Sequence, residues 1–542
     1  MMDISFAFRT AELDLYGYTC SLYVYTFENV YALDPDSVER QEDGDCTTFR
    51  CANLVWAGGQ EKAPGQVTVA ARRTPEGAVR VKIQVAGMAH VIRSTRLVIH
   101  NLRPGCVANY LETTCPEIDE EGINLHYPEA WRTLDVSMVL LRHADGPMTC
   151  LRSLDTEVRD KRFVFLKVGD LVQGELIHEE AADRMDYGVE VPEWELRQVA
   201  SLEEGYALHQ AHIERCFDLQ PWESRPDVPD WARDISLLAG IHGQHWSGYI
   251  FNTYAQMAET LRYLTDRLDG KHILAYLPGW EGRYYWQYGD YRADERMGGH
   301  EGLMALAQEA RRLGVHVMPM FGINVVNQGL PTFEQWGATS RIVSASGNCG
   351  GGSVDWDGGR HFDEGFGASL NPGAPQWQTR LVHQIHEVVD AYGFDAVFLD
   401  IAAIWANDPN HNIYEGIRDL VRRIREGHEH LLVCGEGWYD GLGAIFPVFQ
   451  SGHTFGPMNY HDALYPPIFD TYCRNTAHLC LGDPSRGSTG VHELGTNRAA
   501  WRTPLRKGVW PTLTIVDGTL QAAPERVDEI LEDARQYAEK YL

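Results

Sequence analysis

The stretch Phe394–Ile401, which reads Phe-Asp-Ala-Val-Phe-Leu-Asp-Ile, decides the fold of this sequence. It is a short apolar run that follows a glycine turn at Gly393 and ends on the carboxylate of Asp400. Such a run is typical of a strand buried on both faces of a parallel sheet. A carboxylate at the tip of a buried strand is costly to desolvate, so we expect it to have a partner or a chemical use.

A second strand of the same kind is predicted at Leu431–Glu436, and it also ends on an acid. The segment between the two strands, Ile413–Glu426, has the periodicity of an amphipathic helix. Consecutive strand–helix units deliver their strand tips to one rim of a parallel barrel, where active-site loops gather. We therefore predict that Asp400 and Glu436 face a shared site.

Strands and helices alternate from Trp231 onward, which predicts eight strand–helix units and a (β/α)8 TIM barrel. The predicted strands are 235–241, 272–277, 316–321, 394–400, 431–436, 454–458, 479–481 and 511–516. The predicted helices are 254–268, 301–313, 376–392, 413–426, 467–477 and 524–542. An open doubly wound sheet is the alternative, but no Gly-rich phosphate fingerprint follows the first strand.

The N-terminal part of the chain has a different pattern. Residues 1–200 are predicted to form an antiparallel β-sandwich, because short strand patterns alternate with turn residues. Residues 201–230 are interpreted as a helical linker that ends in a proline-rich segment. Residues 231–542 would then form the catalytic barrel. The predicted fold class is therefore multidomain, an antiparallel β-sandwich followed by an α/β barrel.

Composition and charge limit the classes of partner. The 542 residues include 47 basic and 76 acidic side chains, which gives a net charge of −29. Nucleic acids and anionic membranes attract basic patches, so we expect neither as a partner. The 11 cysteines form no CxxC pair, which favours a reduced, cytoplasmic protein. The N-terminus lacks a signal-peptide pattern, and no apolar run reaches the ~20 residues of a membrane span.

Aromatic and polar residues cluster where the predicted barrel strands end. Aromatic rings stack on the apolar faces of a sugar, and fixed donors and acceptors bind its hydroxyl groups, so we expect a carbohydrate partner. The candidate substrate-binding residues are His242, His245, Trp246, Trp280, Tyr284, Trp286, Asn324, Trp405, Trp438, His461 and Asp462.

We predict no metal and no other cofactor. His242 and His245 are three residues apart in a loop, and neither an HExxH pattern nor a third ligand accompanies them. The glycine-rich segment 348–359 carries aspartates, but their spacing is not that of an EF-hand. A loop that covers the substrate is the better interpretation of this segment.

The paired acids suit cleavage of a glycosidic bond. That reaction needs one carboxylate at the anomeric carbon and a second acid at the leaving oxygen. The short side chain of Asp400 suits a nucleophile, and the longer side chain of Glu436, beside Trp438, suits an acid whose pKa is raised by partial desolvation. In a retaining enzyme the two carboxyl groups would lie about 5–5.5 Å apart. Alternatively, both acids are structural and pair with rim arginines or cap helices.

The segment Leu370–Pro372 before a helix, followed by Tyr392–Asp400, resembles the approach to the nucleophile in retaining α-glycosidases. These are the amylase-like barrels and their relatives in glycoside hydrolase families 13, 31, 36 and 101. An Asp on strand four with a Glu on strand five is similar to the amylase-like and family 101 layout. The resemblance implies that Asp400 is the nucleophile, that Glu436 is the general acid/base and that His461 and Asp462 contact substrate.

Other members of this group suggest a different assignment. Families 31 and 36 carry their acid as an Asp on strand six, which would give that role to Asp462 instead of Glu436. With either acid, the prediction is a retaining glycoside hydrolase that acts on α-linked oligosaccharides or glycosides. Two further alternatives stay open: a carbohydrate-binding barrel without catalysis, and a lyase or isomerase that needs a metal or a differently placed base.

Overall fold

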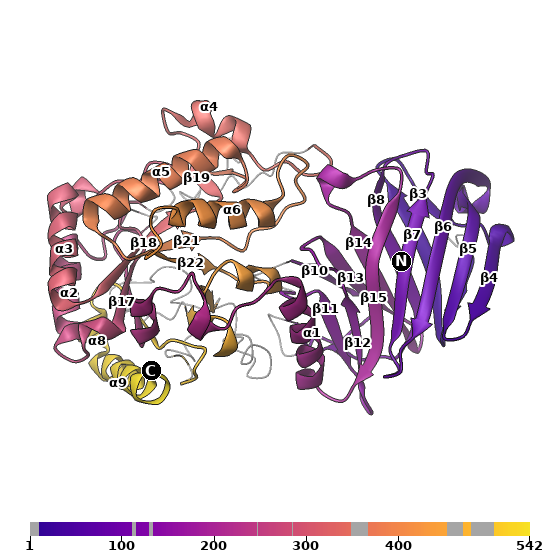
Figure 1. The fold of residues 1–542 in the computed structure, drawn as a ribbon, viewed down its shortest axis with the longest axis horizontal. Helices are drawn as coiled ribbons and strands as arrows, with labels where there is room; N and C mark the ends of the chain where they lie inside the picture. The colour runs from indigo at the N-terminus through magenta and orange to yellow at the C-terminus, as the bar shows by residue number, and fades with distance from the viewer. Residues whose placement is uncertain are drawn as a thin grey trace.

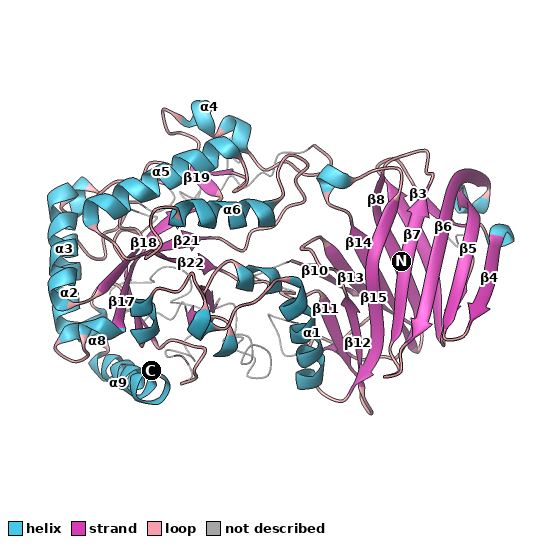
Figure 2. Cartoon of the chain, in the orientation of Figure 1, coloured by secondary structure: helices cyan, strands magenta, loops and turns pink. Residues whose placement is uncertain are grey.

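The computed structural model describes residues 10–110, 115–128, 134–245, 248–283, 286–347, 367–452, 470–477, 503 and 505–542. Within these ranges the chain forms a large antiparallel sheet and a parallel barrel surrounded by helices. Figure 1 shows the sheet at one end of an elongated molecule and the barrel at the other, with α1 (Leu202–Cys216) between them. Figure 2 shows that helices are concentrated around the barrel.

The antiparallel sheet has 15 strands. They are β1 (Leu13–Leu15), β2 (Tyr18–Thr26), β3 (Val30–Leu33), β4 (Val38–Asp43), β5 (Cys46–Trp56), β6 (Glu61–Arg73), β7 (Val79–Ala86), β8 (Ile92–Leu102), β9 (Cys106–Val107), β10 (Ile123–Tyr127), β11 (Met138–Arg142), β12 (Met148–Ser153), β13 (Lys161–Val168), β14 (Leu171–Glu179) and β15 (Val189–Val199). The main path runs β10-β13-β14-β8-β2-β3-β5-β6-β7-β15-β12-β11-β9.

This sheet folds back on itself. Buried and exposed side chains alternate along β7, as expected when one face of a strand is covered and the other is solvated. Phe163 on β13 and Trp194 on β15 are far apart in the strand order, yet their rings pack edge to face with centroids 5.7 Å apart. The two halves of the sheet therefore bury each other's inner faces, and the predicted antiparallel sandwich is confirmed.

The second sheet has eight parallel strands in the order β24-β23-β22-β21-β18-β17-β16-β25. They are β16 (Leu237–Ile241), β17 (Ile273–Leu277), β18 (His316–Gly322), β21 (Ala396–Asp400), β22 (Leu432–Glu436), β23 (Val448–Gly452), β24 (Arg474–Ala477) and β25 (Thr512–Ile515). The two end strands also meet, because Ala477 N–H donates to Thr512 Oγ1 at 3.3 Å and Trp510 N–H donates to Asn475 O at 2.9 Å. The sheet is therefore a nearly closed barrel, as predicted.

The barrel helices match the sequence signals for starts and stops. They are α2 (Tyr254–Thr265), α3 (Gly299–Leu313), α5 (Pro375–Tyr392), α6 (Ile413–Arg425) and α9 (Pro524–Tyr541), with the short helices α4 (Phe333–Trp336) and α8 (Thr519–Ala522). Thr253 and Gln256 form a capping box at the start of α2. Gly393 ends α5 in the left-handed conformation, with φ of 66°, and so turns the chain into β21.

The last part of the barrel differs from the prediction. The strand that pairs with β22 is β23 at 448–452, and the predicted strand at 454–458 lies outside the described residues. Residues 474–477, predicted to end a helix, form β24 instead, while the predicted strand at 479–481 lies outside the described residues. The sequence of β24, Arg-Asn-Thr-Ala, lacks the β-branched and apolar residues typical of a strand, so its hydrogen bonds to neighbouring strands decide its conformation.

A buried polar contact joins the sheet and α1 to the barrel. Asp440 lies four residues after Glu436, in the 3-10 helix Asp440–Ala444. Its carboxylate accepts a hydrogen bond of 2.5 Å from Tyr127 on β10 and lies 2.8 Å from Nε2 of His209 on α1. Because all three side chains are buried, these contacts fix the barrel segment that follows Glu436.

The cysteines differ from the sequence-based expectation of a reduced protein. Cys106 and Cys115 form a disulfide within the N-terminal sheet region. The other described cysteines are free thiols, and most are buried. Among the helices that the structure describes, none combines the length and apolar character needed to cross a bilayer.

Candidate active site

Two acids meet at the carboxyl ends of neighbouring barrel strands. Asp400 is the last residue of β21 and Glu436 is the last residue of β22, and these strands pair in parallel with Leu399 opposite Gly435. Every residue of both strands is buried, as the apolar runs predicted. Asp400 is 4% exposed and Glu436 is 3% exposed. The strand register therefore brings the two predicted acids to one place at the rim.

The carboxyl groups of Asp400 and Glu436 are close enough to influence each other, because Glu436 raises the pKa of Asp400. Tyr288 donates its hydroxyl proton to Asp400 Oδ2 at 2.7 Å. The backbone N–H of Ile401 donates to Glu436 Oε2 at 2.7 Å. One carboxyl group is thus held by the Tyr288 hydroxyl and the other by the Ile401 amide.

The Asp400–Glu436 pair favours one shared proton over two negative charges. Burial raises the pKa of Asp400 well above its usual value, and the neighbouring Glu436 carboxyl raises it further, while the Tyr288 hydrogen bond opposes both effects. The expected separation of about 5–5.5 Å between the two carboxyl groups stays a prediction. Neighbouring carboxyl groups disfavour each other's ionisation, which is the direction of the shift at Asp400.

Ile401, directly after Asp400, has a strained backbone. Its φ is 55°, in the left-handed region that a β-branched side chain rarely adopts. The same residue donates its N–H to Glu436, so the strained turn supplies one of the contacts that fix the acid pair. Strain of this kind persists only where the surrounding structure enforces it.

Ile401→Gly is expected to give a more stable protein than Ile401→Ala, by about 1 kcal/mol. Both variants lose the isoleucine side chain, but only glycine adopts this φ without strain. In the interior of a helix or strand the order of stability is the reverse, since alanine is favoured over glycine there by roughly 0.5–1 kcal/mol. Thermal unfolding of the two variants measures the difference. A more stable alanine variant would show that position 401 stores no strain.

Tyr288 reaches Asp400 because the facing residue on β18 has no side chain. Gly322 pairs with Asp400 in the sheet register. A Cβ atom at Gly322 would lie 2.0 Å from the Tyr288 ring. Tyr291 contributes from the same segment by donating its hydroxyl to Gly322 O at 3.2 Å. The aromatic segment after β17 therefore packs onto β18 and positions the hydroxyl that contacts Asp400.

A third buried acid lies near this pair. Glu281, which follows β17, is 1% exposed. Burial raises the pKa of Glu281 to about 8, with Asp294 acting in the same direction and a backbone hydrogen bond opposing. The charge of Glu281 in turn raises the pKa of Asp400. The rim therefore holds three buried carboxyl groups whose ionisation is suppressed by burial and by one another.

Glu281→Gln is expected to stabilise the protein increasingly as the pH rises from about 4.5 to about 8. Because the pKa of Glu281 is raised in the folded state, its protonated form contributes stability that is present at low pH and is lost as the carboxyl ionises. Glutamine stays neutral, so the variant avoids this loss, which is on the order of a few kcal/mol. The melting temperature of the variant minus that of wild type should be several degrees larger at pH 8 than at pH 5.

Glu259→Gln provides the control for this measurement, because Glu259 is an exposed glutamate on α2. It should change the melting temperature equally at both pH values. A pH-independent effect of Glu281→Gln would show that Glu281 is not a buried acid that ionises with difficulty.

A cavity of about 490 Å³ lies beside the acids, between the sheet and the barrel. Its barrel wall includes Asn324, Ile401, Trp405 and Asn407. Neither Asp400 nor Glu436 lines it, but Ile401 is covalently bonded to Asp400 and hydrogen-bonded to Glu436. The volume is in the range of small-molecule sites, and Ile401 is the residue that places the cavity next to the acid pair.

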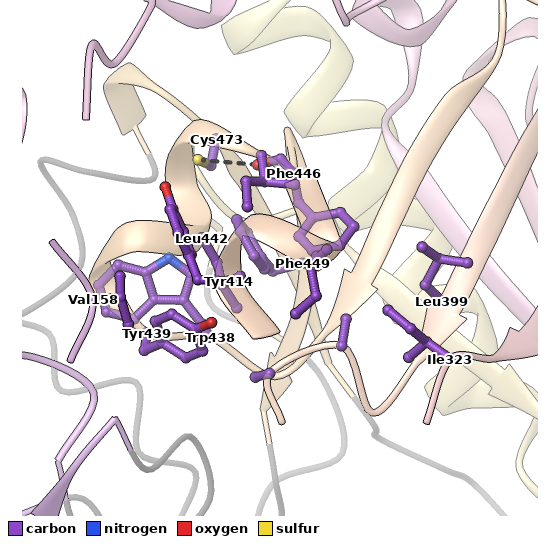
Figure 3. Close-up of a cluster of buried hydrophobic side chains, with 14 of the residues drawn as sticks. Val158, Ile323, Leu399, Tyr414, Trp438, Tyr439, Leu442, Phe446, Phe449 and Cys473 are labelled. Carbon is purple, nitrogen blue, oxygen red and sulfur yellow. Dashed lines mark hydrogen bonds between the residues drawn. The ribbon is translucent and has the colours of Figure 1, made fainter. Parts of the chain in front are cut away.

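The predicted substrate-binding residues occupy two kinds of place. Asn324 and Trp405 line the cavity. Trp280 is fully buried and donates its indole N–H to Met320 O at 2.9 Å, so it packs within the barrel. Figure 3 shows Trp438 next to Tyr439 within a buried apolar cluster, to which Val158 contributes from the sheet region. Trp438 is only 2% exposed and therefore packs in the core.

Three of the remaining candidates, His242, His245 and Trp286, do not line the cavity. His242 and His245 pack against the ring of Phe251, and burial lowers the pKa of His245 to about 4. Trp286 stacks under the Arg283 guanidinium at 4.1 Å. The other four candidates lie outside the described residues: Trp246, Tyr284, His461 and Asp462. The alternative acid Asp462 therefore stays a prediction, as does the covering loop at 348–359.

Metal ligands are not gathered anywhere in the described part of the chain. Within it, no three His, Cys, Asp or Glu side chains converge to hold an ion. His242 and His245 share the ring of Phe251 as a neighbour.

Sequence reasoning missed three residues of this site. Tyr288 lies just beyond the aromatic segment that follows the second barrel strand, so that signal could have found it. Asp160, a cavity residue from the sheet, had no such signal, because acids are common in the turns between strands. The strain at Ile401 cannot be found from residue type, since isoleucine is among the last residues expected at a positive φ.

Comparisons with solved structures identify proteins of the same architecture. The α-N-acetylgalactosaminidase NagBb from Bifidobacterium bifidum, in complex with GalNAc, superposes with a TM-score of 0.66 at 14% identity, over 98% of this chain and 93% of that one. The galactosidase domain of the α-galactosidase-sucrose kinase AgaSK superposes with a TM-score of 0.53 at 12% identity, over 96% of this chain and 74% of that one. A third match is a variant of the family 36 α-galactosidase AgaA from Geobacillus stearothermophilus, bound to 1-deoxygalactonojirimycin. It superposes with a TM-score of 0.52 at 11% identity, over 96% of this chain and 73% of that one.

These matches show that the chain has the fold of such α-glycosidases, the superfamily that the sequence motif resembles. The sequence itself matches no protein-family model and no curated protein.

Proposed function

We propose that this chain is a retaining glycoside hydrolase that acts on α-linked oligosaccharides or glycosides. The observation that carries the proposal is the buried pair of Asp400 and Glu436 at adjacent strand tips, beside a cavity of small-molecule size. The fold supports it, because it is shared with an α-N-acetylgalactosaminidase and with α-galactosidases. The α-linked sugars named in those structures are therefore the first substrates to test.

In the proposed mechanism, Asp400 attacks the anomeric carbon while Glu436 protonates the leaving oxygen. Glu436 then removes a proton from the water that hydrolyses the glycosyl-enzyme. Burial and Glu436 both raise the pKa of Asp400, so we propose that the pair carries a single proton, which must reside on Glu436 when Asp400 attacks. Tyr288 holds one oxygen of Asp400 and favours its ionised form, as a nucleophile needs.

The retaining arrangement needs the two carboxyl groups about 5–5.5 Å apart, with the sugar between them. The pair must be able to adopt this separation when substrate binds. Glu436 has one more rotatable bond than Asp400, and its carboxylate is held at one oxygen by the Ile401 amide. We therefore propose that the Glu436 carboxyl moves and the Asp400 carboxyl stays fixed by Tyr288.

A panel of 4-nitrophenyl α- and β-glycosides tests this function, with the α-galactoside and the α-N-acetylgalactosaminide included. The expected result is hydrolysis of an α-glycoside, with the α-anomer as the first product observed by ¹H NMR. A β-anomer formed first would show inversion. Binding of sugars without hydrolysis across the panel would favour the alternative of a non-catalytic carbohydrate-binding barrel.

A further inference from the structure

The cavity beside the acid pair has a second wall that comes from the N-terminal sheet. Arg93 lies on β8, Asp160 directly precedes β13, Arg162 lies on β13 and Glu179 ends β14. The barrel wall begins at Ile401 and Asn324 and continues along the loop after β21 to Trp405 and Asn407. The cavity therefore starts next to the acids and extends away from them toward the sheet.

The loop that carries Trp405 is fixed to the sheet. Asn407 Oδ1 accepts a hydrogen bond from the Ala182 backbone at 2.7 Å. Asn407 Nδ2 donates to Glu179 Oε1 at 3.1 Å and to Glu180 O at 2.8 Å. These three bonds hold the barrel loop and the end of β14 together. The two walls thus form one preorganised surface, which lowers the cost of ordering the site when a ligand binds.

Asp160 is the acid of this wall that is not neutralised by a cation. Its side chain is 13% exposed and lies 4.0 Å from His126 Nε2, and no arginine or lysine of the described chain lies within ion-pair distance of it. Burial raises the pKa of Asp160 to about 7, with Glu179 adding to the effect, whereas the nearby Trp405 indole lowers it. Among the described residues, the Trp405 indole nitrogen has no partner in good hydrogen-bonding geometry. The carboxyl group of Asp160 can therefore still accept a hydrogen bond from a further donor.

The two arginines of the same wall both form ion pairs with Glu179. Arg93 Nε lies 3.3 Å from Glu179 Oε2, and an Arg162 guanidinium nitrogen lies 3.5 Å from the same oxygen. The cavity therefore offers no free cation among these residues to attract an anionic group. What it offers is an aromatic side chain, a carboxyl acceptor beside it and the amide of Asn324. An aromatic face with adjacent acceptors is suited to a neutral polyhydroxylated ring.

We propose that this cavity is a binding subsite for the leaving-group sugar of an α-linked disaccharide or oligosaccharide, with Trp405 as its stacking surface and Asp160 as the specificity-determining acceptor of a sugar hydroxyl. The ring that reacts must contact Asp400, which does not line the cavity, so the cavity holds the next ring. The N-terminal sheet thus takes part in choosing the substrate. This inference rests on the proposed glycosidase function and adds the requirement for a sugar leaving group.

The test compares two substrates that share a glycone. One is the 4-nitrophenyl α-galactoside or α-N-acetylgalactosaminide, whichever the wild type cleaves; the other is that glycone α-linked to galactose. Asp160→Asn should lower kcat/KM for the disaccharide about tenfold and leave that for the aryl glycoside within about twofold. Trp405→Ala should lower kcat/KM for the disaccharide at least as much. Trp405→Phe should keep part of the kcat/KM that Trp405→Ala loses.

Asp183→Asn is the matched control, because Asp183 is an exposed acid of the same sheet region that does not line this cavity. It should leave kcat/KM for both substrates unchanged, and all variants should keep a single cooperative thermal unfolding transition. Equal losses on both substrates, or a wild type that cleaves the aryl glycoside but not the disaccharide, would overturn the subsite. A wild type that cleaves neither substrate, nor any other α-glycoside, would instead overturn the proposed function.

Discussion

Asp400→Asn is expected to lower kcat by about 10⁴-fold or more, with the fold intact. The amide cannot act as the nucleophile, but it has nearly the same shape and keeps an oxygen for the Tyr288 hydrogen bond. The same variant should melt at a higher temperature than wild type at neutral pH. Because burial and Glu436 raise the pKa of Asp400, ionising that carboxyl destabilises the folded wild type as the pH rises above about 4.

Hydrolysis of the preferred 4-nitrophenyl α-glycoside and thermal unfolding measure these two effects. Asp395→Asn provides the control, because Asp395 precedes β21 and pairs with His316 at 3.2 Å, away from the acid pair. It should leave kcat within about twofold of wild type. Turnover at the wild-type rate by Asp400→Asn would remove Asp400 from the mechanism.

Glu436→Gln is expected to lower kcat by about 10²- to 10⁴-fold on substrates with poor leaving groups. The loss should be smaller for the glycosylation of the enzyme by a dinitrophenyl glycoside, since that leaving group needs no proton. Azide should raise the rate of the variant and give an α-glycosyl azide, because azide attacks the glycosyl-enzyme without a general base. Steady-state kinetics across a series of leaving groups measures the first effect, and product analysis measures the second.

Glu429→Gln is the control for this prediction, because Glu429 is an exposed glutamate in the segment before β22. It should show wild-type rates on the whole series. If Glu436→Gln lost the same factor on every leaving group and did not respond to azide, Glu436 would be a structural partner of Asp400, and the acid would have to be sought elsewhere.

Local sequence patterns were sufficient for most of the barrel. The apolar runs of β21 and β22 carry their own signal, and each ends on its acid because a parallel strand buried on both faces tolerates a carboxylate only at its tip. Their adjacency also follows from sequence, since one amphipathic helix connects them. The strand β24 could not be found this way, because its polar residues become a strand only through pairing with β23.

The surroundings of the acid pair were less accessible to sequence reasoning. Tyr288 reaches Asp400 only because Gly322 leaves room, and that relation joins two strands and a loop. Asp160 reaches the cavity because the sheet packs against the loop after β21, a contact between segments more than 200 residues apart. The effect of Glu436 on the pKa of Asp400 also depends on side-chain conformations that residue spacing does not determine.

Covalent trapping tests the central claim most directly. Incubation with a 2-deoxy-2-fluoro α-glycosyl fluoride of the preferred sugar, or its 5-fluoro counterpart, slows hydrolysis of the glycosyl-enzyme so that it accumulates. Mass spectrometry of the digested protein should then find one added sugar on the peptide that contains Asp400, and Asp400→Asn should remain unlabelled. A label on another carboxylate, or full hydrolysis with the β-anomer as first product and no label, would contradict the account.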